Sequence, residues 1–145
     1  MESNPFLLTQ EINNYLVGLN NLMNIQQTIG LFEEVMDTVK KLKSINVSSE
    51  TEKIRVVEYV LPKEISYHVA KGTFDEGMEL LPRIEKQLAV YENQMGKPFQ
   101  LSIYTNIVEL CIMAESFRKA LQWNNRILNS EEIETDDSGN ETDEP

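Results

Sequence analysis

Apolar residues recur along most of this chain at the three- and four-residue spacing that places side chains on one face of a helix. The first such face predicts a helix closed by Gly30, with apolar positions at Leu8, Ile12, Tyr15, Leu16, Leu19, Leu22 and Met23. A second helical face follows directly, with Phe32, Val35, Met36, Val39, Leu42 and Ile45. The alternating pattern of strands with hairpin turns does not compete anywhere.

The middle of the chain predicts a long helix and then a shorter one. Residues 48–52 carry capping residues and early acids, which are typical of a helix start, and this helix is expected to run to about Lys71. Pro62 should kink or split it, because proline lacks an N–H donor and clashes with the preceding turn. Gly72 ends the helix, and the next one has Pro82 inside it and apolar positions at Phe74, Met78, Leu81, Ile84, Leu88 and Tyr91.

Two further helices are expected after a break at residues 95–98, MetGlyLysPro. The fifth presents Ile103, Tyr104, Ile107, Leu110, Cys111 and Ala114. The sixth follows a turn at residues 115–116 and presents Ala120, Leu121, Asn124, Ile127 and Leu128. The pattern therefore predicts an all-α domain over residues 1–129, with three antiparallel helix pairs at about 5–46, 48–95 and 97–129.

One short segment occurs three times, each time as a turn, an aromatic residue and then a helix. Phe32 and Phe74 are 74 − 32 = 42 residues apart, and Phe74 and Phe117 are 117 − 74 = 43 residues apart. A recurrence at this period is the signature of stacked helical repeats. Such proteins usually bind other proteins.

The net charge of −11 is concentrated at the C-terminus. Residues 131–145 hold eight acids and no base, which leaves 24 − 8 = 16 acids against 13 bases in the rest of the chain. This segment has a single apolar residue, Ile133, so we expect a disordered acidic tail over 130–145. Neither part offers the basic face that nucleic acid or an anionic membrane requires.

The remaining composition favours one cytoplasmic domain. With 145 residues and 41% hydrophobic content, the chain can bury a core. It has neither an apolar run of about 18 residues nor a secretory start. Cys111 is the only cysteine, which excludes an internal disulfide and a cysteine-based metal cluster.

The repeated segments resemble the tetratricopeptide repeat family. GTFDEGMELLPRIEKQL at 72–88 is similar to the family's second helix, and YTNIVELCIMAESFRKALQWNNRIL at 104–128 is similar to a whole repeat. The resemblance implies a right-handed solenoid in which a small residue, Gly77 or Ala120, lets paired helices approach closely. The period here exceeds the standard 34 residues. The chain is thus most similar to divergent bacterial members with long repeats.

The resemblance also implies a function, namely a non-enzymatic scaffold that binds a protein or peptide in a groove formed by the first helix of each pair. By position, this groove would contain Asn20, Asn24, Gln27, Tyr59, Ser66, Thr105, Glu109 and Met113. Asn20 and Ser102 stand where carboxylate-clamping relatives carry lysine, and Lys63 is the sole basic candidate. A carboxylate clamp is therefore disfavoured. Solvated polar side chains that merely keep this face soluble are the alternative.

The array is expected to end without a polar capping helix, which solenoids use to cover the last apolar face. Nothing in residues 130–145 has the apolar positions to form one. Two explanations remain open: the chain associates with itself through its last helix pair, or it is a shortened relative of a longer array.

A second function is suggested by His68, Lys71 and Gly72, which form an H-x-x-K-G motif. It resembles the phosphorylated segment of histidine phosphotransfer domains, in which an exposed helical histidine accepts a phosphoryl group. The same residues also suit a repeat boundary, with a lysine in the last turn and a glycine C-cap. Phosphotransfer by His68 is therefore the alternative to the scaffold.

No other catalytic, metal or cofactor site is predicted. His68 is the only histidine, and Cys111 lies on an apolar helix face, where a free cysteine is usually a small buried hydrophobe. Glycine-rich phosphate loops are absent. Acidic pairs at 33–34 and 75–76 fall in the first turns of helices, where they complement the helix dipole.

Overall fold

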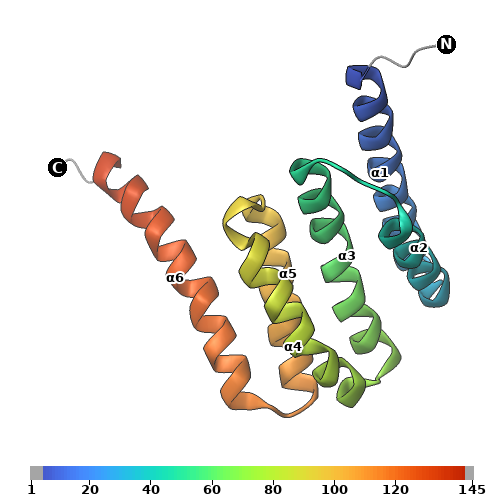
Figure 1. The fold of residues 1–145 in the computed structure, drawn as a ribbon. Helices are drawn as coiled ribbons and strands as arrows, with labels where there is room; N and C mark the ends of the chain where they lie inside the picture. Colours follow the sequence, from blue (N-terminus) through green and yellow to red (C-terminus); the bar gives the residue numbers. More distant parts are fainter. Residues whose placement is uncertain (1–4, 143–145) are drawn as a thin grey trace.

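The computed structural model describes the backbone of residues 5–142 and the side chains of residues 10–130. Over that range the chain is all-α and has no strand, as predicted (Figure 1). Its elements are α1 (Pro5–Thr28), α2 (Phe32–Ser44), α3 (Glu50–Lys71), α4 (Phe74–Tyr91), the 3₁₀ turn η1 (Glu92–Gln94), α5 (Lys97–Met113) and α6 (Phe117–Thr142).

The ends of α3 show how local sequence sets the helix boundaries. Ser49 Oγ accepts a hydrogen bond from the Glu52 N–H at 3.1 Å, and Glu52 Oε1 accepts one from the Ser48 N–H at 3.3 Å. These contacts satisfy backbone donors that have no partner in the first turn. At the other end Gly72 takes a left-handed conformation with φ 74°, which only glycine adopts without strain. Pro62 lies inside α3 without splitting it.

The last helix is longer than expected. α6 continues to Thr142, well inside the segment 130–145 for which we predicted disorder, so that prediction is not confirmed. No proline interrupts residues 117–142, and extending an existing helix avoids the cost of nucleation. The side chains of residues 131–142, and residues 143–145 altogether, lie outside the described part.

Each helix packs against the next one along the chain, and the odd-numbered helices also pack against each other. α3 contacts α1, α2, α4 and α5, and α5 contacts α3, α4 and α6. Figure 1 shows the helices following one another across the molecule, with α1 and α6 at opposite ends. Consequently α3 and α5 are covered on several sides, whereas α1 and α6 each have a neighbour on one side.

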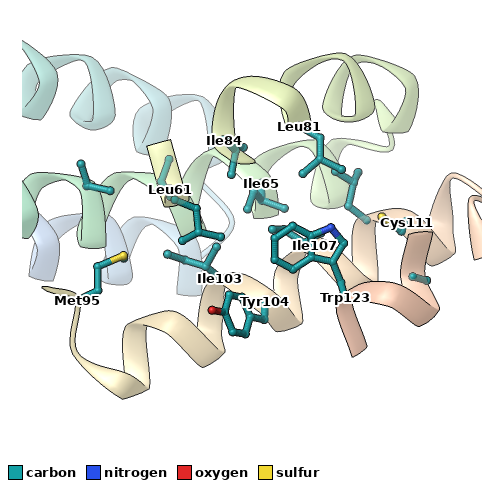
Figure 2. Packing of buried hydrophobic residues seen from close by; sticks show 14 residues of the cluster. Leu61, Ile65, Leu81, Ile84, Met95, Ile103, Tyr104, Ile107, Cys111 and Trp123 are labelled. Carbon is teal, nitrogen blue, oxygen red and sulfur yellow. The ribbon is translucent and has the colours of Figure 1, made fainter. Parts of the chain in front are cut away.

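The core consists of two apolar clusters. The first joins α1, α2 and the N-terminal half of α3, with Leu16, Met23, Val39, Leu42 and Val60 among its buried residues. The second joins α3, α4, α5 and α6, and its central members appear in Figure 2 as Leu61, Ile65, Leu81, Ile84, Ile103 and Ile107. Phe99, at the start of α5, packs against both clusters.

Charged side chains link the helices on two sides. Glu64 of α3 is buried, and its carboxylate accepts bonds from Lys43 of α2 and from Arg83 of α4, the latter at 3.2 Å. Because a buried charge is costly unless it is paired, the two partners are needed to hold Glu64 there. This ion-pair network joins α2, α3 and α4.

A second network joins η1, α5 and α6. Glu92 accepts hydrogen bonds from Tyr104 of α5 and Arg126 of α6. The Arg126 guanidinium lies over the rings of Tyr104 and Trp123, 4.9 and 4.5 Å from their centroids. Burial, and secondarily the bond to Glu92, raises the pKa of Tyr104 to about 12. The network holds the middle of α6 against α5.

Candidate protein-interaction groove

Polar side chains predicted for the groove meet where α1 lies beside α3. Lys63 Nζ donates hydrogen bonds to Asn24 Oδ1 and Gln27 Oε1, both at 2.6 Å. Gln27 Nε2 is in turn 3.5 Å from Ser66 Oγ, at the outer limit of a hydrogen bond. The structure thus brings three predicted groove residues, Asn24, Gln27 and Ser66, around the one lysine considered at the sequence level.

The environment of Lys63 is partly desolvated. Burial lowers the pKa of its ammonium, because removal from water penalises the charged form. The two amide oxygens use two of the three donors that an ammonium carries. A ligand that offers a further oxygen to Lys63 would complete the coordination of this charge.

A small hollow of about 140 Å³ lies next to this lysine, and its walls come from three helices. α1, α3 and the N-terminal half of α5 line it with Asn20, Asn24, Glu58, Tyr59, Pro62, Lys63, Phe99 and Ser102. Tyr59 is buried and meets Phe99 edge-on at 5.8 Å between centroids. It therefore contributes an apolar floor to the hollow rather than an exposed binding side chain.

The remaining predicted groove residues lie elsewhere on α5. Thr105, Glu109 and Met113 are exposed, and none of them lines the hollow. Thr105 follows Ser102 by three residues, and Glu109 and Met113 follow at further steps of four. This spacing places the four residues on one face of α5. The predicted set is therefore a compact α1–α3 cluster with an exposed α5 row that continues from Ser102.

Sequence reasoning did not assign three residues of the hollow to it, Glu58, Pro62 and Phe99. Glu58 Oε2 accepts a hydrogen bond from the Gly96 N–H at 2.8 Å, which fixes the turn before α5. Phe99 comes directly after the Gly-Lys-Pro break, where the first turn of α5 meets α3. Phe99 could have been assigned to the hollow because it is an aromatic residue beside a helix start. Nothing in the neighbouring sequence distinguishes Glu58 from the other acids of α3.

His68 is partly buried near the end of α3 and has contacts on several sides. Its Nδ1 is hydrogen-bonded with Thr73 Oγ1 at 2.8 Å, and Tyr67 lies edge-on at 5.3 Å between centroids. Its carbonyl accepts the Thr73 N–H at 3.0 Å, in the turn that closes the helix at Gly72. Lys71 pairs instead with Glu33 of α2 at 3.0 Å.

Two further features bear on reactive chemistry, the thiol of Cys111 and the grouping of metal-binding side chains. Cys111 is buried, and burial raises the pKa of its thiol, which opposes the thiolate that nucleophilic chemistry needs. In the part of the chain whose side chains are described, no three His, Cys, Asp or Glu residues are grouped so as to hold a metal ion.

No helix among the described residues is long and apolar enough to cross a membrane. No family model, curated protein or solved structure matches the chain. The likeness to tetratricopeptide repeats therefore stays a hypothesis that rests on the residues quoted for it.

Proposed function

We propose that this protein is a non-enzymatic scaffold, a right-handed tetratricopeptide-like array of three helix pairs that binds a peptide segment of another protein. The packing order supports the array, because α1, α3 and α5 contact one another in sequence and each contacts its own second helix. The first helices then form one continuous face, and this face carries the candidate groove.

The observation that carries the proposal is the hollow around Lys63. Asn24, Lys63 and Ser102 come from three different helices, α1, α3 and α5, yet all three line the same hollow. Amide, ammonium and hydroxyl groups are the donors and acceptors that recognise a peptide backbone and polar side chains. The rings of Tyr59 and Phe99 lie in the same lining and add an apolar contact.

The hollow indicates a partner segment with an oxygen-rich polar group rather than a doubly held C-terminal carboxylate. Lys63 is the only cation that lines the hollow, and the amides of Asn20 and Asn24 flank it. The ammonium of Lys63 and the neutral amides and hydroxyl beside it can bind a backbone carbonyl, whereas the carboxylate of Glu58 in the same lining disfavours a ligand carboxylate. The exposed row Thr105, Glu109 and Met113 would contact the next part of the same segment.

The test is selection from a displayed random peptide library, followed by affinity measurement on defined variants. Lys63→Met removes the ammonium and keeps an unbranched chain, and we expect the selected peptides to bind about tenfold more weakly or worse. Lys86→Met, on the exposed side of α4, is the matched control and should leave affinity unchanged. Equal loss in both variants, or a library that yields no binder, would count against this groove.

Histidine phosphotransfer through His68 is the alternative, and its support is weaker. A phosphoacceptor histidine needs an exposed ring, whereas His68 is partly buried and bonded to Thr73. The lysine expected to steady the phosphate pairs with Glu33 instead. Incubation with acetyl phosphate separates the two functions: the scaffold predicts no acid-labile phosphate, and phosphate that disappears in His68→Gln would establish the alternative.

A further inference from the structure

The groove between α3 and α4 is filled by the next helix of the chain. A Cβ built at Gly77 of α4 would lie 2.8 Å from Leu110 Cδ1 of α5 and 3.0 Å from His68 Cβ of α3. Leu110 therefore inserts directly over Gly77. The groove residues around this contact all belong to the packed core or border it: Ile65, Val69, Phe74, Gly77, Met78 and Leu81.

The groove between α5 and α6 is built from the corresponding positions, and no helix of residues 5–142 lies in it. Adding the repeat length of 43 to 65, 69, 74, 77, 78 and 81 gives 108, 112, 117, 120, 121 and 124. A surface groove of about 440 Å³ is lined by those six residues: Val108, Ile112, Phe117, Ala120, Leu121 and Asn124. The third helix pair thus repeats the receiving groove of the second pair.

The large apolar side chains of the open α5–α6 groove are more exposed than their counterparts in the filled α3–α4 groove. Phe74 is partly buried beside α5, whereas its counterpart Phe117 is 58% exposed. Leu121 is 66% exposed, although its counterpart Met78 packs against the core. Large apolar side chains gathered in one groove mark an interaction surface more often than scattered ones do.

The other end of the molecule carries the corresponding inserting face. Subtracting both repeat lengths, 42 + 43 = 85, from the inserting residues of α5 places Ile107 and Leu110 at Leu22 and Ile25 of α1. The two α5 residues are fully buried, whereas Ile25 is 58% exposed and Leu22 is also exposed. On α3 the corresponding residue is Tyr67, which reaches back to Glu33 of α2 at 2.9 Å.

The charge of α1 suits burial of this face. Glu11 is the only charged residue in the 24 residues of α1, although charged residues make up 26% of the whole chain. A helix that faces water usually carries charges on its outer side. The free face of α1 instead presents isoleucine, leucine and neutral amides.

We propose that the α5–α6 groove of one molecule receives α1 of a second copy, so that molecules associate head to tail. The contact would repeat the one that α5 makes with the α3–α4 groove inside the chain. Because the two surfaces differ, the interface is heterologous, and each added copy presents a new open groove. This inference concerns the terminal faces and stands apart from peptide binding around Lys63.

Sedimentation velocity on the full chain over a wide concentration range tests the proposal. The weight-average mass of the wild type should rise above the 16.7 kDa monomer in successive steps. Leu121→Glu blocks the groove and Ile25→Glu blocks the inserting face, so each variant alone should stay monomeric. Val90→Glu, at a 67% exposed position on α4 outside both faces, is the matched control and should assemble like the wild type.

An equal mixture of the two blocked variants gives the sharpest result. Leu121→Glu keeps an intact α1, and Ile25→Glu keeps an intact groove, so the mixture should reach twice the monomer mass and stop there. A mixture that stays monomeric overturns the proposal, as does a wild type that stays monomeric at every concentration. If Leu121→Glu blocks assembly but Ile25→Glu does not, two grooves pair with each other and α1 is not the occupant. Circular dichroism melts verify that both exposed-site variants fold.

Discussion

The α3–α4 groove and the α5–α6 groove are built from matching positions 43 residues apart, yet one is core and the other is surface. Phe74 and Phe117 begin equivalent second helices, and Ile65 and Val108 occupy equivalent places in first helices. What differs is whether a helix of the described part of the chain lies in the groove. In a stacked array, the burial of a side chain is decided by the next unit as much as by its own.

The small residue of each second helix sharpens the contrast. Gly77 leaves no room for a methyl group beneath Leu110, whereas Ala120, which is 6% exposed, already carries one in the lining of the open groove. A helix seated on Ala120 must therefore lie slightly farther out than α5 lies on α4. The two grooves share their architecture and differ in how closely an occupant can approach.

The largest expected effect is the difference in stability between alanine variants of the two inserting residues, Leu110 and Ile25. Leu110→Ala removes a fully buried side chain from the filled groove and should lower the free energy of unfolding by about 2–5 kcal/mol. Ile25→Ala, at the equivalent exposed position, should change it by less than about 0.5 kcal/mol in dilute monomer. Urea denaturation of both variants measures the difference, and similar losses would refute the assignment of these faces.

The next effect concerns the aromatic residue at the start of each second helix. Phe74→Ala removes a partly buried ring that packs on the core and should destabilise by about 2 kcal/mol. Phe117→Ala should be close to neutral in the monomer, because its ring is largely exposed. If Phe117→Ala proved as costly as Phe74→Ala, the last groove would have to be filled within a single molecule.

Alkaline pH tests the network of Glu92, Tyr104 and Arg126, which joins η1, α5 and α6. The pKa of Tyr104 is raised from 10.0 to about 12 in the folded protein, so folding favours the protonated phenol. The associated stability is fully present below pH 10 and is lost as pH rises from 10 towards 12. Tyr104→Phe should therefore lose less stability than the wild type over this window, as measured by denaturation at each pH. Identical slopes of stability against pH in the two proteins would show that folding does not raise the pKa of Tyr104.

The smallest effect is expected from the acidic C-terminus. Removal of residues 131–145 takes away eight acids and one apolar residue, so the melting temperature should stay nearly unchanged. Differential scanning calorimetry of the truncated and full chains makes the comparison. A drop of many degrees would mean that this segment covers the open groove and that the two grooves are less different than described.

Much of the fold could be predicted because its signals are local. Apolar spacing predicted the six α-helices seen over residues 5–142, and Ser49 and Gly72 predicted the two ends of α3 through capping chemistry that involves only nearby residues. Pro62 was expected to kink or split α3, and the helix is continuous through it. The disorder predicted for residues 130–145 is not confirmed, because α6 continues to Thr142, and composition alone does not show that an existing helix can propagate.

The candidate site was predictable only as far as the repeat pattern reached. Asn24, Gln27 and Ser66 were named by position, and the structure brings them around Lys63. The exposed row on α5 lies outside the hollow. The burial of Glu64 between two cations depends on distant partners on α2 and α4, which no local pattern displays.

A double-mutant cycle on Gly77 and Leu110 tests most directly how successive helix pairs stack. Gly77→Ala alone should destabilise, because the new methyl group would lie 2.8 Å from Leu110 Cδ1, and overpacking of this kind costs about 1–3 kcal/mol. In the Leu110→Ala background the same change should cost less, since both Leu110 methyl groups are gone, alanine favours the helix, and His68 Cβ at 3.0 Å is the close contact that remains. A coupling of about 1 kcal/mol or more is therefore predicted. An equal cost of Gly77→Ala in both backgrounds would contradict the insertion of α5 over α4.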